Sequence, residues 1–230
     1  MRQSCLFKGL PDDEIMEFIS LFPCRVENFR QGDCIISKDE VSRSIGMVLE
    51  GTLGIYTDSL YGGHTLIGIG DRDYIFGFIA KFFNNEKSIT ALYCRKYCKV
   101  AFFAVKENLG PVDFIRQTNP MILANIYEML TDHIRADFNR MHIISSPSVR
   151  VRFIRYLLSR YAQTGQTTFD LFFTHSELAD YLGVYRTSLS REITKLSQLG
   201  LIAMEKSIVS MKRIDEIIEI ECKSYARCGY

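Results

Sequence analysis

The sequence lacks the segments that would direct a chain to a membrane or out of the cell. Residues 1–10 have neither the charged start nor the long apolar run and small-residue cleavage site of a signal peptide. No uninterrupted apolar stretch approaches the roughly 18 residues that a membrane-spanning helix needs. We therefore expect a soluble protein that works in the cytoplasm and has no membrane partner.

Paired cysteine motifs are also missing. The seven cysteines include no C-x-x-C pair, so no zinc or dithiol motif is indicated. They are Cys5, Cys24, Cys34, Cys94, Cys98, Cys222 and Cys228. We interpret Cys94 and Cys98, the closest pair, as reduced core residues at strand ends around a short polar turn, because free cysteine packs as a small hydrophobe. The alternative is a thiol-based redox protein or enzyme that uses these two residues.

An excess of basic charge is absent from the whole chain, whose net charge is +1. From Ser148 onward, however, there are twelve Lys and Arg against nine Asp and Glu, whereas the residues before it carry sixteen against eighteen. A DNA-binding module at the C-terminal end would place its charge in this way. With 47% hydrophobic and 24% charged residues, the 230 residues suffice for two modest globular domains.

The first half of the chain predicts a short helix followed by an all-β region. Residues 11–20 combine acids in a first turn with apolar residues at helical spacing. From about residue 25 to 105, β-rich runs alternate with turn residues, and glycines separate them at the roughly 8–12-residue spacing of a sandwich or barrel. The runs cover 34–37, 45–49, 53–56, 65–69 and 89–93.

A long helix is predicted to begin at Asn119-Pro120, because Asn can cap a helix and Pro is tolerated at its first position. One set of residues recurs at alternating steps of four and three, which is typical of a coiled-coil seam. This predicted dimer seam comprises Ile122, Ile126, Met129, His133, Ala136, Arg140 and Ile143. A second face carries Leu123, Tyr127, Leu130, Ile134, Phe138 and Met141.

Two apolar faces on one helix need two partners. We expect one face to pack on the β-domain and the other on the twin helix of a homodimer, with burial of the helix inside one monomer as the alternative. The Ser-Ser-Pro-Ser run at 145–148 ends the helix and marks a domain boundary.

Residues 174–196 predict a helix, a tight turn and a second helix. Thr174 and Glu177 have the spacing of a capping box. Ala179 is small enough for a second helix to cross closely, and Gly183 can take the positive φ of the turn. Apolar residues at the remaining offsets would close the core between the helices: Leu178, Leu182, Val184, Leu189, Ile193 and Leu196.

The second helix has the composition of a DNA recognition helix. Arg can bond guanine through two donors in the major groove, and Ser, Thr and Lys can contact thymine methyls or phosphates. A hairpin over 200–211, turning near Lys206, makes the module a winged helix. A helix from about Ser148 precedes the motif, and we expect its arginines to form salt bridges or exposed charge. The predicted DNA-binding residues are Thr174, Ser176, Arg186, Thr187, Ser188, Ser190, Arg191, Lys195 and Lys206.

Over nearly its whole length the sequence resembles the family of the cyclic-AMP receptor protein and the fumarate-nitrate reduction regulator, the Crp/Fnr family. The resemblance rests on residues 30–33, 48–56 and 74–77, on Asn119-Pro120, and on the winged helix with its 199–202 segment. It implies an α+β protein: a double-stranded β-helix (jelly-roll) sensor over 1–118, a central dimerisation helix and hinge over 119–146, and a winged helix-turn-helix over 147–230. It also implies a regulator that binds a palindromic double-stranded operator.

The departures from the family pattern bear on the effector. Nucleotide-binding members have Glu after Phe-Gly and Arg a few residues later, whereas here Phe78 follows Gly77 and Lys87 stands near the Arg position. Without those contacts cyclic AMP is not expected as the effector. The cysteines are too dispersed for an iron–sulfur cluster, and His64 is interpreted as a surface turn residue rather than a heme ligand.

The predicted protein is a regulator without catalytic residues, metal or identified cofactor. A small-molecule effector would bind between the β-domain and the long helix, near Phe78, Phe82, Lys87 and Tyr127. RNA polymerase would be a further partner of an activator.

Overall fold

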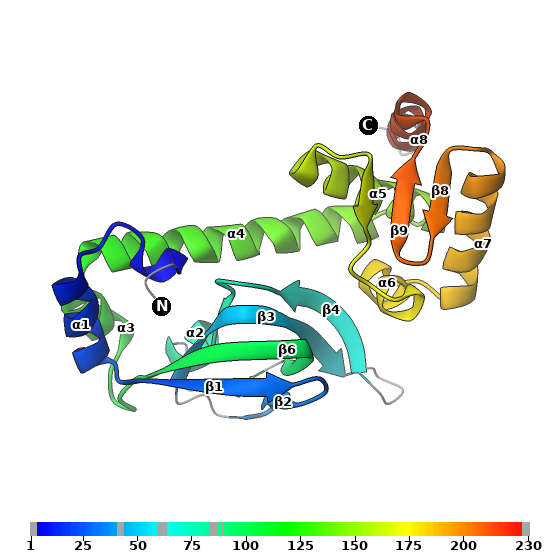
Figure 1. The fold of residues 1–230 in the computed structure, drawn as a ribbon. Helices are drawn as coiled ribbons and strands as arrows, with labels where there is room; N and C mark the ends of the chain where they lie inside the picture. Colours follow the sequence, from blue (N-terminus) through cyan, green and yellow to red (C-terminus); the bar gives the residue numbers. More distant parts are fainter. Residues whose placement is uncertain (1–3, 41–43, 59–63, 83–86, 89, 227–230) are drawn as a thin grey trace. The chain divides into compact units, whose positions relative to one another are not determined.

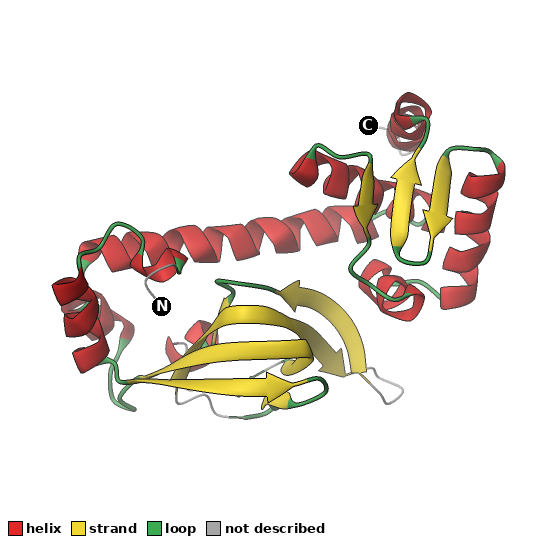
Figure 2. Cartoon of the chain, in the orientation of Figure 1, coloured by secondary structure: helices red, strands yellow, loops and turns green. Residues whose placement is uncertain are grey.

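The computed structural model describes all residues except 1–3, 41–43, 59–63, 83–86, 89 and 227–230. The chain divides into two compact units, Met1–Ile134 and Arg135–Tyr230. This division lies inside the long helix α4 (Pro120–Ile144), the helix that the Asn119-Pro120 pair predicts. The mixed α and β composition agrees with the predicted fold class (Figure 2). Each unit is described separately.

The first unit is built on an antiparallel sheet with the strand order β1-β6-β3-β4, in which β2 also pairs with β6 and β5 with β3 (Figure 1). Its strands are β1 (Cys24–Arg30), β2 (Cys34–Ile36), β3 (Ser44–Asp58), β4 (His64–Gly70), β5 (Ile75–Phe76) and β6 (Ala91–Ala104). Its helices are η1 (Cys5–Phe7), α1 (Asp12–Leu21), α2 (Phe78–Phe82), α3 (Pro111–Gln117) and the first part of α4.

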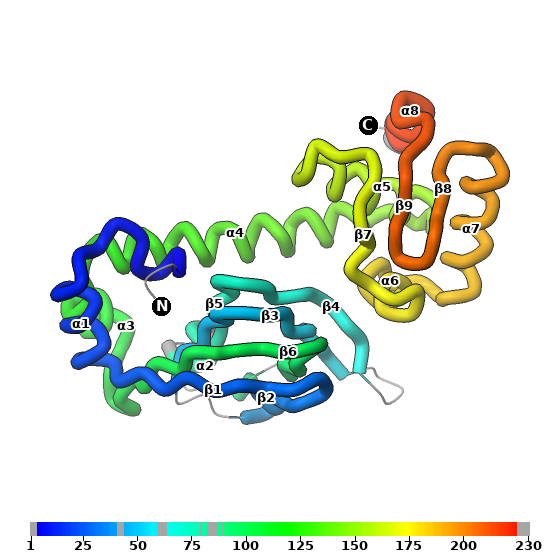
Figure 3. Tube along the Cα trace, viewed as in Figure 1, coloured from blue at the N-terminus to red at the C-terminus, as the bar shows by residue number. Residues whose placement is uncertain are grey.

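Two strands are longer than the sequence indicates. The predicted runs 45–49 and 53–56 form one strand, β3, whose register against β6 shifts at Gly51. Gly51 has φ +89°, and a Cβ there would overlap the carbonyl oxygen of Tyr97, so the close crossing requires glycine. The expected turn between Cys94 and Cys98 is wrong, because both residues lie inside β6. Figure 3 traces β6 between β1 and β3.

Strand β6 divides the core of the first unit in two, because successive side chains point to opposite faces of a sheet. Ala101 and Phe103 face a cluster that includes α1, α3 and α4. Cys98, Val100 and Phe102 face a second cluster with residues of β2 and β3. The first cluster is rich in aromatic rings, with Phe18 lying 5.6 Å from Phe103 and Phe22 lying 5.1 Å from Phe114 between ring centroids.

Helix α4 has two apolar faces, as predicted, but the face assigned to the dimer is covered by the chain itself. Ile122, Ile126 and Met129 belong to the buried cluster of the first unit, and Ile143 is only 1% exposed. The predicted seam is therefore wrong at these four positions. Its remaining members are His133, which stacks on Tyr74 at 4.3 Å between ring centroids, Ala136, which is exposed, and Arg140, which bonds to Tyr181.

The other face of α4 is the one that stays exposed. Tyr127 is 72% exposed and Phe138 is 63% exposed, and Ile134 and Met141 are exposed as well. Leu123 and Leu130 are half-buried against the first unit. Helical spacing reveals both faces, but only the packing of the β-domain determines which one is covered.

The second unit holds the last turns of α4, the helices α5 (Val149–Thr164), α6 (His175–Leu182), α7 (Arg186–Gln198) and α8 (Ile214–Ala226), and the strands β7 (Thr168–Asp170), β8 (Ile202–Glu205) and β9 (Ile208–Met211). The predicted hairpin is β8 and β9, and β7 adds a third antiparallel strand in the order β7-β9-β8. The serines of the 145–148 run flank the start of α5, where the Ser148 side chain accepts from the Val151 amide.

The burial of Ile126 gives a direct test of the corrected α4 face. Truncation to Ile126→Ala should lower the free energy of unfolding of the first unit by about 2–5 kcal/mol, because it leaves a cavity in a packed core. Ile115→Ala, at an exposed position of α3, is the matched control and should change it by less than about 0.5 kcal/mol. Chemical denaturation of both variants measures the difference. Equal stability of the two would contradict this assignment of the faces.

Candidate nucleic-acid interface

Helix α6 begins at the predicted capping box. The Glu177 amide donates to Thr174 Oγ1 at 3.2 Å, and the Thr174 amide donates to Glu177 Oε2 at 2.7 Å. Both residues thereby satisfy amides that have no partner inside the helix. The start of α6 is fixed by local sequence alone, as predicted.

The turn between α6 and α7 depends on Gly183 and on a distant arginine. Gly183 has φ +62°, the left-handed conformation that glycine adopts without cost. Arg152 of α5 donates from Nη1 to the carbonyls of Leu182 at 2.9 Å and Gly183 at 2.8 Å. A Cβ on Gly183 would lie 3.3 Å from that same nitrogen. Gly183 therefore serves both the backbone conformation and the approach of the guanidinium.

The predicted core between α6 and α7 is present. Leu178, Leu182 and Leu189 are completely or almost completely buried, as is Leu196, and Ile193 is buried too. Ala179 is also buried, and its carbonyl accepts from the Val184 amide at 3.0 Å, which closes the turn. Val184 is half-buried. These contacts orient α7 so that its opposite face is free of the domain core.

The opposite face of α7 carries the predicted recognition residues. Arg186, Thr187 and Arg191 are exposed, and Ser188 and Ser190 are half-buried. Neither arginine has an intrachain hydrogen bond or ion pair among the described residues. Both guanidiniums are thus available to an external acceptor. The non-bridging oxygens of DNA phosphates and the N7 and O6 atoms of guanine are acceptors of this kind.

Lys195 differs from these arginines because it already has an acidic partner. Its Nζ lies 2.8 Å from Glu192, and Arg150 of α5 donates to the same carboxylate at 2.8 Å. Burial of Glu192 opposes its ionisation, but the hydrogen bonds from Lys195 and Arg150 outweigh it and lower the pKa of Glu192. The one acid of α7 is therefore neutralised within the chain and does not repel an anionic partner.

The wing and the start of α6 supply the other predicted contacts. Lys206 lies exposed at the tip of the β8–β9 hairpin with φ +54°, and Ser207 contacts the Asp170 carboxylate at 3.0 Å. Thr174 and Ser176 are exposed at the N-terminal end of α6. All nine predicted DNA-binding residues thus lie in the second unit, eight of them on the helix-turn-helix and Lys206 on the wing. DNA contact by each of them stays a prediction.

The arginines of α5 act inside the domain, as expected. Arg150 binds Glu192, Arg152 holds the turn, and Arg155 donates to Glu221 of α8 at 3.2 Å. Arg155 also donates to the carbonyl of His142 at 2.8 Å, near the end of α4.

Two features of this surface were not predicted. Tyr185, directly before α7, is 84% exposed. Arg140 of α4 donates from Nε to the carbonyl of Tyr181 at 3.2 Å, and its Cζ lies 5.4 Å from the centre of the Tyr181 ring. Spacing along α4 places Arg140 in an interhelical seam, and no local signal shows that its partner is a carbonyl of α6.

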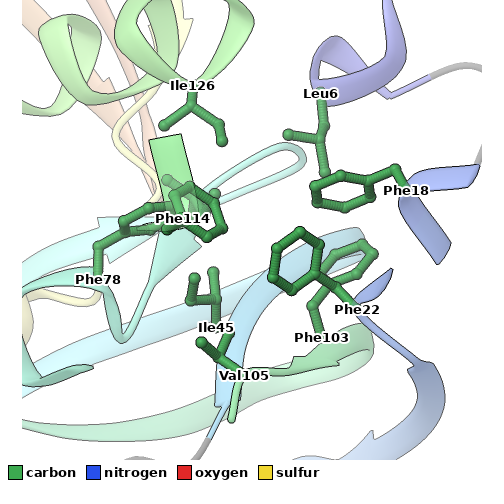
Figure 4. Close-up of a pocket in the computed structure, with 10 residues that line it drawn as sticks. Leu6, Phe18, Phe22, Ile45, Phe78, Phe103, Val105, Phe114 and Ile126 are labelled. Carbon is green, nitrogen blue, oxygen red and sulfur yellow. The ribbon is translucent and has the colours of Figure 1, made fainter. Parts of the chain in front are cut away.

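The first unit contains an apolar cavity, but it is small. Its volume is about 10 Å³, at the lower limit of the roughly 10–15 Å³ that a single water molecule needs. Figure 4 shows the aromatic rings that close around it, including Phe18, Phe22, Phe78 and Phe114, together with aliphatic side chains such as Ile126 of α4. A small-molecule effector does not fit this space without displacing these side chains.

The predicted effector residues are not brought together there. Phe78 lines the cavity, with its ring 5.9 Å from that of Phe114. Tyr127 and Lys87 are exposed and do not line it. The Phe82 side chain lies outside the described residues.

The two buried thiols and His64 show no reactive environment. Burial, together with a hydrogen bond to Cys98, raises the pKa of Cys94 to about 12. Cys98 donates to the carbonyl of Thr52 at 3.0 Å. A protonated buried thiol is a poor nucleophile. His64 is exposed and lies 3.3 Å from Asp58, in keeping with a surface residue.

Comparison with known proteins agrees with this geometry. Residues 151–217 match the Crp-like helix-turn-helix domain. The chain is 23% identical to the regulatory protein HlyX of Actinobacillus pleuropneumoniae. The alignment extends over 223 residues and covers 94% of this chain and 89% of HlyX. It is 20% identical to the fumarate and nitrate reduction regulatory protein of Escherichia coli K12, over 95% of this chain and 86% of that protein. The structure of a CooA mutant from Carboxydothermus hydrogenoformans has a TM-score of 0.72 at 13% identity, covering 88% of this chain and 89% of that one.

Residues 151–217 therefore form a Crp-like helix-turn-helix domain, and over most of its length the chain is similar to transcription regulators of the Crp/Fnr family. The matched helix-turn-helix domain lies within the second unit, and the fold of the chain as a whole is that of the CooA structure. Both curated relatives named above are regulatory proteins. Among the described residues, no helix combines the length and apolarity needed to cross a membrane.

The turn of the DNA-binding domain can be tested through Gly183. The variant Gly183→Ala should lower the free energy of unfolding of the second unit by about 1–2 kcal/mol, since an L-residue is strained at positive φ. Gly110→Ala is the control, because Gly110 has φ −80° and open space around the added methyl. Thermal unfolding of the two variants provides the measurement. A loss no larger at Gly183 than at Gly110 would show that the turn does not require glycine.

Proposed function

We propose that the protein binds a palindromic operator as a homodimer, with one α7 helix from each chain in successive major grooves. The observation that carries the proposal is the exposed face of α7, on which Arg186 and Arg191 have no intrachain partner among the described residues. A two-fold dimer presents two such helices, and operators of helix-turn-helix proteins repeat their half-sites about 34 Å apart, one turn of DNA. The proposed location is the cytoplasm, where such an operator is accessible.

The exposed face of α4 supports the homodimer. Tyr127, Ile134, Phe138 and Met141 follow one another at steps of seven, four and three, which is the spacing of a coiled-coil seam. Large apolar side chains that are this exposed on one helix face favour association. The seam of the proposed dimer is therefore this face instead of the one through Ile126.

The effector of the proposed regulator is not cyclic AMP. The position at which nucleotide-binding relatives carry Glu is occupied by Phe78, whose side chain packs among apolar residues of the first unit. A phenyl ring offers no acceptor to a ribose hydroxyl. The signal that the first unit receives is an unidentified small molecule, and RNA polymerase is the further partner if the protein activates transcription.

A thiol-based redox enzyme has less support than a regulator. Cys94 and Cys98 are both buried. Burial and a side-chain hydrogen bond to Cys98 raise the pKa of Cys94 to about 12. A neutral thiol at this depth is neither nucleophilic nor accessible to a substrate.

The dimer seam is tested by a charge on the exposed face of α4. Phe138→Glu should convert the dimer to monomer, because two carboxylates would then face each other in an apolar seam. Met16→Glu, at an exposed position of α1, is the control and should stay dimeric. Sedimentation velocity separates the two outcomes. A dimeric Phe138→Glu with wild-type operator affinity would reject this seam.

Base reading is tested by binding-site selection from random duplexes. We expect Arg191→Ala to lose affinity for the selected operator by about 1–3 kcal/mol and to relax the preference for one guanine, because a bidentate contact is lost. Lys206→Ala is the matched comparison: loss of a phosphate contact should weaken specific and non-specific binding alike and lower the salt slope by roughly one. An unchanged guanine preference in Arg191→Ala would assign that base to another residue, with Arg186 tested next.

A further inference from the structure

We infer that Arg140 is a positioning residue for DNA binding, which ties the last turns of α4 to the C-terminal end of α6 directly before the helix-turn-helix turn. Its Nε donates to the Tyr181 carbonyl at 3.2 Å, and its guanidinium lies over the Tyr181 ring with Cζ 5.4 Å from the centroid. The inference rests on the proposed role of α7 in reading DNA and concerns how that reading helix is held.

The carbonyls at the end of α6 explain why a cation is needed there. The last four carbonyls of a helix have no partner within it, and the aligned peptide dipoles give that end a partial negative charge. Arg140 holds the carbonyl of Tyr181, and Arg152 holds those of Leu182 and Gly183. Three consecutive carbonyls of the α6 end and the turn are thereby bonded to guanidiniums, one from α4 and one from α5.

The ring of Tyr181 extends this contact into the domain core. It stacks on Phe173 with the centroids 5.0 Å apart, and it meets Tyr156 of α5 edge-on at 5.9 Å. Burial lowers the pKa of Arg140, and the neighbouring Tyr181 and Asp137 oppose that change. Arginine stays charged in proteins, so the guanidinium remains a donor. Arg140 thus contacts α6 at both the carbonyl and the ring of Tyr181.

The end of α4 is also tied to α5 and to the segment after it. Asn139 donates to Ser159 Oγ at 2.6 Å, and Arg155 donates to the His142 carbonyl at 2.8 Å and to Ser145 Oγ at 3.0 Å. Side-chain hydrogen bonds therefore link the last turns of α4 both to α5 and to the helix-turn-helix. A change in the orientation of the α4 end would be passed to α6, and from α6 to the turn and α7.

Operator binding of the full-length protein tests this role. Arg140→Ala should weaken binding to the selected operator by roughly tenfold, since a charged hydrogen bond and a ring contact are lost together. The slope of log K against log salt for non-specific duplex should stay unchanged, because Arg140 is not proposed to touch phosphate. Arg140→Lys should recover part of the lost operator affinity, since an ammonium can still donate to the Tyr181 carbonyl. Arg135→Ala, an exposed arginine on the same helix, is the matched control and should bind as wild type.

Three results would overturn the inference: wild-type operator affinity in Arg140→Ala, a salt slope lowered by about one, or dissociation into monomers in sedimentation. Wild-type affinity would mean that Arg140 has no role in DNA binding. A lowered salt slope would mean that it contacts phosphate directly, and dissociation into monomers would mean that it belongs to the dimer seam. If Arg140→Ala unfolds the second unit, Tyr181→Leu replaces it, since it removes the ring and keeps the carbonyl; folded Tyr181→Leu with wild-type affinity would also reject the role. The proposed function fails separately, through Arg191→Ala that retains both affinity and base preference.

Discussion

The burial of Ile122, Ile126 and Met129 in the aromatic core of the first unit determines which side of α4 remains exposed. Three apolar side chains on one face, each 6% exposed or less, anchor the helix to the β-domain. Burial of large aliphatic side chains stabilises a fold by roughly 1.5–3 kcal/mol each, so this face is not released to a partner at small cost. The opposite face is left with exposed rings and aliphatic chains. The proposed dimer follows from that constraint, because these side chains stay exposed among the residues that the structure describes.

The second unit depends on a different requirement, which is to satisfy the carbonyls that a short helix leaves unpaired. Helix α6 has only eight residues, so its unpaired ends are a large fraction of its backbone. Its N-terminal end is satisfied locally by Thr174 and Glu177, whereas its C-terminal end relies on Arg140 and Arg152 from two other helices. The residues that satisfy the two ends come from different parts of the sequence for a physical reason. Side-chain acceptors such as Thr and Glu reach their own helix amides from nearby positions, while guanidiniums come here from far along the sequence.

This difference explains what the sequence could predict. The capping box, Gly183 in the left-handed conformation and the buried leucines of α6 and α7 depend on spacing within about 25 residues, and all were predicted correctly. The bulged pairing of β3 with β6, the covered face of α4 and the partner of Arg140 depend on contacts between distant segments. Periodicity shows that α4 has two apolar faces but contains no information on which face meets the β-domain. The effector residues were placed by analogy with the family pattern, and the packing of Phe78 against Phe114 fills that part of the first unit with aromatic rings.

The use of basic residues in the second unit reconciles DNA binding with a net charge of only +1. Arg150, Arg155, Lys195 and Lys223 are paired with carboxylates, and Arg152 is bonded to carbonyls. Arg186, Arg191, Lys206 and Lys212 have no intrachain partner for their charge among the residues that the structure describes. Because phosphate neutralisation supplies sequence-independent affinity, a domain with so few unpaired cations gains less from the DNA backbone and relies more on base contacts. Under the proposed function, sequence specificity would therefore rest on a small number of side chains held in the right orientation. The hydrogen bonds that orient α7 would then matter as much as the residues on its exposed face.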